Sequence, residues 1–172
     1  MSLLNKYLNR ISFDSYEDFY QNCRLQIPEH FNFAYDVMDW YADNEPERIA
    51  LIWCDDSIDD IKITFKELQL RTNRLANVLK SHGIGRGDCV MLCLKSRHEF
   101  WPAIMACHKL EAIAIPATHM LKAHDISYRI EKADIKAVIA TKYDDLLDQF
   151  DIAIKETKNL IKCLICVGEQ RP

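Results

Sequence analysis

Residues 89–141 read "CVMLCLKSRHEFWPAIMACHKLEAIAIPATHMLKAHDISYRIEKADIKAVIAT", in which short apolar runs alternate with longer amphipathic segments. The runs at 89–94 and 112–117 are continuously apolar, as is typical of strands buried on both faces, and residues 136–141 are predicted as a further strand. The segments between them place apolar residues at helical spacing. A further helix and an apolar run at 160–168 extend the alternation. The order predicts an α/β fold, a mostly parallel sheet flanked by helices on both faces.

Two Ser/Thr-x-x-Glu patterns predict where helices begin. Glu67 follows Thr64 by three residues, so the Thr64 hydroxyl can accept the N–H of Glu67 while the Glu67 carboxylate accepts that of Thr64. The same pattern at Ser96 and Glu99 predicts a second capping box, ahead of the helix that precedes the 112–117 strand.

The part before residue 64 is predicted as a helical lead-in followed by a helix and a hairpin. Residues 1–30 are predicted to form the lead-in, and residues 31–172 the α/β subdomain. A helix is expected at 32–43, and its apolar face is expected to carry Val37, Trp40 and Tyr41. The runs 49–55 and 61–65 flank a charged turn and predict an antiparallel pair.

Three of the four glycines lie in "SHGIGRGDC", residues 81–89. A phosphate-binding glycine motif requires a strand, then the glycines, then a helix. Here a predicted helix comes first and a strand follows, so the glycines are interpreted as a turn. Gly83 is the residue expected to end the helix in the left-handed conformation.

Composition excludes several function classes. The net charge of −4 gives no general attraction to nucleic acid, and no apolar run reaches the roughly 18 residues of a membrane span. The polar, acidic N-terminus does not resemble a signal or transit peptide, so we expect a cytoplasmic protein.

The seven cysteines are irregularly spaced, which argues against disulfides and against a metal site. We expect them to be small buried hydrophobic residues. Six of them lie in apolar stretches: Cys54, Cys89, Cys93, Cys107, Cys163 and Cys166.

Thr118 and His119 are the residues most suited to face a ligand. They follow the end of the 112–117 strand, and ligands of open parallel sheets bind beyond the carboxyl ends of strands. A plain turn is the alternative interpretation. His119 and His124 lack the spacing of a metal pair on one helix face. The residues alone therefore predict neither a catalytic group nor a metal site.

Several landmarks occur together in one part of the chain. They are Thr-Phe-x-Glu-Leu at 64–68, Asn-Arg-x-Ala-Asn at 73–77, Gly-x-x-x-Gly-Asp at 83–88, Glu-Phe at 99–100, Pro116 at a strand end, and Asp-Ile-x-Tyr-Arg at 125–129. Together they resemble the adenylate-forming, AMP-binding acyl-CoA synthetases, and most of all their medium-chain and aromatic acyl branch. The resemblance implies the N-terminal subdomain of the acyl-CoA synthetase fold.

The resemblance also implies a function for the complete protein. A carboxylate, ATP and CoA would become acyl-CoA, AMP and pyrophosphate, with Mg²⁺ accompanying the ATP. The family's phosphate loop, ribose-binding Asp and catalytic Lys have no counterpart in these 172 residues. We therefore expect an inactive fragment that binds no cofactor by itself. Thr118 and His119 would line the channel that the CoA pantetheine takes in similar enzymes.

Two other interpretations stay open at this point. The chain could be a stand-alone small α/β module that binds a ligand or a protein, or a non-catalytic truncated relative that acts through protein contacts. The acyl substrate and the oligomeric state do not follow from the sequence.

Overall fold

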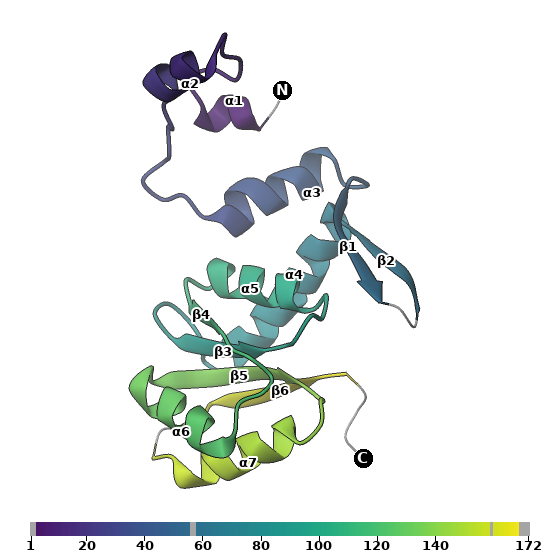
Figure 1. The fold of residues 1–172 in the computed structure, drawn as a ribbon, viewed down its shortest axis with the longest axis vertical. Coiled ribbons are helices and arrows are strands. Elements are labelled where there is room, and N and C mark those ends of the chain that lie inside the picture. Colours follow the sequence, from purple (N-terminus) through teal and green to yellow (C-terminus); the bar gives the residue numbers. More distant parts are fainter. Residues whose placement is uncertain (1–2, 56–57, 159, 169–172) are drawn as a thin grey trace.

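A four-stranded parallel sheet forms the centre of the computed structural model, which describes residues 3–55, 58–158 and 160–168 (Figure 1). Its strands are β3 (Cys89–Cys93), β4 (Ile113–Pro116), β5 (Ile135–Thr141) and β6 (Cys163–Val167), in the spatial order β4-β3-β5-β6. Every neighbouring pair is parallel. The predicted α/β class is confirmed.

Helices cover both faces of this sheet. The pair α4 (Phe65–Ser81) and α5 (Phe100–Lys109) packs on one face, and the pair α6 (Ala123–Lys132) and α7 (Leu146–Glu156) packs on the other (Figure 1). Side chains alternate along β3, so that Leu92 lies in the first core and Met91 in the second. Both are almost completely buried, as a central strand requires.

β4 differs from the prediction. Its apolar composition predicted a strand buried on both faces, but it lies at the edge of the sheet, and Ile113 is 51% exposed. Of the strands that the structure describes, β4 pairs with β3 alone. The prediction was wrong because apolar composition does not distinguish an edge strand from a central one.

One predicted capping box is present and the other is not. Glu67 donates its backbone N–H to Thr64 Oγ1 at 3.2 Å, and Glu67 Oε2 accepts the N–H of Thr64 at 2.9 Å. The box at Ser96 was wrong: α5 begins at Phe100, after Glu99, with no side-chain cap. The Glu99 carboxylate instead accepts two hydrogen bonds from the Arg97 guanidinium, at 2.7 and 3.0 Å. A charged donor two residues away thus replaces the backbone N–H as its partner.

The hairpin and the helix before it also form. β1 (Ile49–Asp55) pairs antiparallel with β2 (Ile58–Thr64), while part of the predicted charged turn, at 56–57, lies outside the described residues. The predicted helix is a π-helical segment, η1 (Ala34–Asp39), followed by α3 (Trp40–Asn44). Its predicted apolar face was wrong, because the buried residues are Ala34, Met38 and Ala42, while Val37, Trp40 and Tyr41 are half-buried. The aromatic ring of Tyr41 stacks instead on Phe65 at the start of α4.

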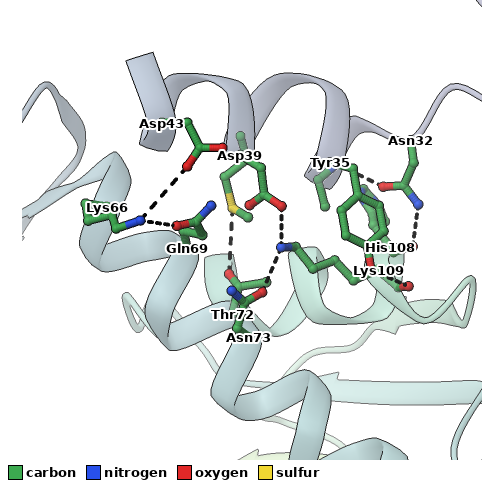
Figure 2. A network of polar contacts seen from close by, with 12 residues as sticks. Asn32, Tyr35, Asp39, Asp43, Lys66, Gln69, Thr72, Asn73, His108 and Lys109 are labelled. Atoms are coloured by element: carbon green, nitrogen blue, oxygen red, sulfur yellow. Dashed lines mark hydrogen bonds and ion pairs between the residues drawn. The ribbon is translucent and has the colours of Figure 1, made fainter. Parts of the chain in front are cut away.

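A buried ion pair attaches η1 to the helices beneath it (Figure 2). Lys109 Nζ at the end of α5 lies 2.6 Å from Asp39 Oδ2 and donates to Asn73 Oδ1 of α4 at 2.7 Å. The Lys109 side chain is only 6% exposed and that of Asp39 18%. Asn32 Nδ2 adds a 2.7 Å bond to the carbonyl of His108. These contacts join three helices that are distant in the sequence.

The lead-in contains two short helices, α1 (Leu4–Tyr7) and α2 (Tyr16–Asn22). An antiparallel bridge joins Leu8 to Leu25, and Tyr7 donates its hydroxyl to the carbonyl of Asp36 at 3.2 Å. Figure 1 shows this part at the end of the molecule remote from the sheet. The domain boundary at residue 30 stays a prediction. Across the described ranges, every helix is too short or too polar to span a bilayer.

Gly83 has the conformation that the sequence predicted, with φ at +73°, and it follows the C-cap residue of α4, His82. A Cβ added there would meet no atom within 4 Å, so any cost of a side chain comes from the backbone conformation alone. Gly85 also has open space but no left-handed φ.

Gly83→Ala should therefore lower the free energy of unfolding by about 1–2 kcal/mol, the cost of a left-handed alanine. Gly85→Ala is the matched control and should be neutral or stabilising by up to about 1 kcal/mol, because it restricts the unfolded chain without strain. Urea unfolding of both variants measures the difference. Equal stabilities would contradict the role given to Gly83.

Candidate functional site

The chain changes direction across the sheet directly after β4. β4 lies on one side of β3, and α6 then returns the chain to β5 on the opposite side of β3. Because α5 and α6 cover opposite faces, the loops at the carboxyl ends of β3 and β4 diverge. In open parallel sheets such a switch point is where ligands bind.

A cavity of about 380 Å³ lies at this point. Thr118 and His119 both line it, together with Lys95 and Ser96 from the loop after β3 and Phe100 from the start of α5. The structure thus places the two sequence-predicted residues in the wall of a cavity. Their role toward a ligand stays a prediction.

The loop that carries these two residues is held by local contacts. Cys93 donates its thiol to the carbonyl of Thr118 at 3.7 Å, and Thr118 Oγ1 accepts the N–H of Met120 at 3.3 Å. The half-buried ring of His119 meets Tyr143 edge to face, with centroids 4.8 Å apart. Tyr143 follows β5, so the contact joins the loops after β4 and β5, two strands that are not neighbours in the sheet.

A second cavity of about 210 Å³ adjoins the first and shares Lys95 and Ser96 with it. Its other lining residues include Trp53 of β1, Arg97, Lys142 and Tyr143. Lys95 has a left-handed backbone, φ +51°, which is strained for a residue with a side chain. Its Nζ lies 3.7 Å from the centroid of the Tyr143 ring, a cation–π contact.

Lys95, Lys142 and Tyr143 were not among the residues predicted to face a ligand. The rule that selected Thr118 and His119 applies equally to the first residues after β3 and β5, and would have found them. Trp53 had no such signal, since it lies on a hairpin outside the parallel sheet.

The charges around the two cavities are positive. Lys95, Arg97 and Lys142 line them, and no lining residue that the structure describes is acidic. The Glu99 carboxylate pairs with the Arg97 guanidinium, which raises the pKa of Arg97 and offsets its charge, so the positive charge at the cavities comes mainly from Lys95 and Lys142. With its aromatic surfaces and few acceptors, the site suits an anionic ligand more than a metal ion, which would need carboxylate or carbonyl ligands.

The cysteines offer no nucleophile at this site. Burial raises the pKa of Cys93 and Cys107 to about 12, so neither is a thiolate at neutral pH. Cys54 and Cys166 are exposed, which corrects the prediction that both are buried. Each lies on a strand at the margin of its sheet. Among the described residues, no group of three or more His, Cys, Asp or Glu side chains could hold a metal ion.

The structure is an α/β domain with two adjoining cavities at the carboxyl edge of its parallel sheet. The model of the AMP-binding enzyme family matches residues 38–170, and the chain belongs to this family.

Known relatives agree with this assignment. Acyl-coenzyme A synthetase ACSM3, mitochondrial, of Mus musculus is 34% identical over 93% of this chain, and ACSM1 of Homo sapiens is 34% identical over 85%. The chain spans 28% and 26% of the length of these two relatives.

Solved structures share the fold. The acetoacetyl-CoA synthetase of Streptomyces lividans superposes with a TM-score of 0.72 at 19% identity, covering 83% of this chain and 23% of that one. A benzoate CoA ligase of Burkholderia xenovorans superposes with a TM-score of 0.64 at 21% identity, covering 80% and 26%.

Proposed function

We propose that these residues form the N-terminal subdomain of an AMP-forming acyl-CoA synthetase. The observation that carries the proposal is the cavity at the switch point, in a chain of the AMP-binding family. In the complete protein a carboxylate would attack the α-phosphate of ATP, forming an acyl-adenylate and releasing pyrophosphate. The CoA thiol would then attack the acyl carbonyl and release AMP.

The contribution of this subdomain is one wall of the CoA channel. Thr118 and His119 line the larger cavity, while Lys95 and Lys142 supply positive charge around the pair of cavities. Groups of this kind suit a ligand with a polar chain and an anionic end. Among the residues that the structure describes, neither cavity lining holds a carboxylate for Mg²⁺, so we place ATP and its metal ion against other parts of the protein.

The test uses a polypeptide that joins these residues to the remaining parts of the family's architecture. His119→Ala should raise the KM for CoA about 5- to 20-fold, as expected when one contact of about 1–2 kcal/mol is lost. It should leave carboxylate-dependent exchange of pyrophosphate into ATP unchanged, because that half-reaction needs no CoA. Residues 1–172 alone should release no AMP.

His124→Ala is the matched control, because His124 belongs to α6 and lines neither cavity. It should change neither half-reaction. A loss of pyrophosphate exchange in His119→Ala would place His119 in the adenylation step and contradict its assignment to the CoA channel.

The compartment also stays a proposal. We expect the cytoplasm, whereas the names of the mouse and human relatives place those proteins in mitochondria. Imaging of the tagged polypeptide together with a mitochondrial marker decides between the two.

A further inference from the structure

The side chain of Trp53 lies at the carboxyl ends of the parallel strands, although Trp53 does not belong to the parallel sheet. It lies on β1 of the two-stranded hairpin, yet its indole lines the smaller cavity. The indole Nε1–H donates to the carbonyl of Ser96 at 2.5 Å. The same ring meets His98 edge to face, with centroids 5.4 Å apart.

The segment that Trp53 contacts, residues 94–98, joins β3 to α5. It contains Lys95, in its strained left-handed conformation, and Ser96, and these two residues line both cavities. The helix that follows has no side-chain cap to fix its start. A strained backbone persists only where surrounding contacts hold it, and the indole supplies two such contacts.

We propose that Trp53 is a positioning residue that fixes segment 94–98, and with it the position of Lys95 and Ser96 in the ligand site. The inference rests on the proposed function for the identity of the ligand. The stabilisation of segment 94–98 by Trp53 does not depend on a ligand and can be measured without one.

The hairpin has other attachments that do not depend on Trp53. Phe65 donates its backbone N–H to the carbonyl of Arg48 at 2.9 Å, and the Thr64 capping box fixes the junction of β2 with α4. Loss of the indole N–H should therefore leave the hairpin folded. This separates a positioning role from a general contribution to stability.

His98 provides a local spectroscopic signal. Burial lowers its pKa; Arg71 and Arg97 lower it further, while Glu99 raises it. The Trp53 ring contributes to that burial by its edge-to-face contact. A ring at position 53 should keep the pKa of His98 low, and its removal should let the pKa rise toward the ordinary value.

The experiment compares two variants of the chain of residues 1–172. Trp53→Phe keeps a ring beside His98 and removes the donor to Ser96, whereas Trp53→Ala removes both. Amide hydrogen exchange by NMR should become about fivefold faster at residues 95–97 in Trp53→Phe, the effect of one lost hydrogen bond. The pKa of His98 should stay low in Trp53→Phe and rise in Trp53→Ala.

Trp101→Phe is the control, since Trp101 lies on α5 and lines a different cavity, beside Phe33 and Met105. It should leave exchange at 95–97 unchanged. Unchanged exchange at 95–97 in Trp53→Phe would overturn the inference. Faster exchange spread evenly over β1, β2 and α4 would also overturn it, because that is the result of a purely structural role.

A kinetic measurement separates this inference from the proposed function. In the longer polypeptide, Trp53→Phe should raise the KM for CoA about fivefold without changing kcat. If His119→Ala raises the KM and Trp53→Phe does not, the positioning role is wrong while the function stands. If neither variant changes the KM for CoA but amide exchange at 95–97 is faster in Trp53→Phe, then CoA is the wrong ligand, while the conclusion that Trp53 stabilises segment 94–98 stands.

Discussion

Lys109→Met should lower the free energy of unfolding by about 3–5 kcal/mol, because it leaves Asp39 buried without its cation. Methionine preserves most of the aliphatic volume, so the effect comes from charge and not from a cavity. Asp39 Oδ1 has no hydrogen-bond partner among the described residues, so the remaining oxygen depends on Lys109. Guanidinium unfolding followed by circular dichroism measures the change.

Lys122→Met provides the matched control. Lys122 also pairs with an aspartate, Asp145 at 2.9 Å, but the two side chains are 64% and 51% exposed. Exposed pairs contribute about 0–1 kcal/mol, so this variant should be almost as stable as the wild type. The double variant Asp39→Leu/Lys109→Met should recover much of the loss, because it removes both buried charges. Equal effects of Lys109→Met and Lys122→Met would contradict a buried, stabilised pair.

Phe150→Ala should lower the free energy of unfolding by about 3–5 kcal/mol. Phe150 is completely buried in the core between the sheet and the helices α6 and α7, and its truncation removes apolar contact and leaves a cavity. Ile152 lies on the same helix but is 44% exposed. Ile152→Ala should cost less than about 1 kcal/mol. A loss for Phe150→Ala as small as that of Ile152→Ala would show that α7 is not packed on the sheet.

The sequence correctly predicted the features that depend on a single local interaction. The Thr64 capping box and the left-handed Gly83 both formed as predicted, since each depends on residues within one turn. The Ser96 box failed because Arg97, which that pattern does not consider, binds the Glu99 carboxylate. In a capping box, nearby hydrogen-bond donors compete for the glutamate carboxylate, and a charged donor binds it more strongly than a backbone N–H does.

Features that depend on tertiary packing were less predictable. The position of β4 at the sheet edge depends on which strands are neighbours. The buried face of the helix over 34–44 depends on a close approach to α4 and α5, which favours Ala34 and Ala42 over the larger aromatic residues. At the candidate site, Thr118 and His119 followed from a rule about strand ends, whereas the contact of Trp53 with Ser96 joins residues 43 positions apart.

The central position of β3 has a consequence for synthesis on the ribosome. β3 is the first parallel strand to emerge, and its two partners appear only later, one on each side. Until β5 has left the exit tunnel, the apolar residues of β3 lack a neighbour on that side. The nascent chain therefore exposes one edge of β3 during this interval, and unpaired strand edges are where aggregation begins.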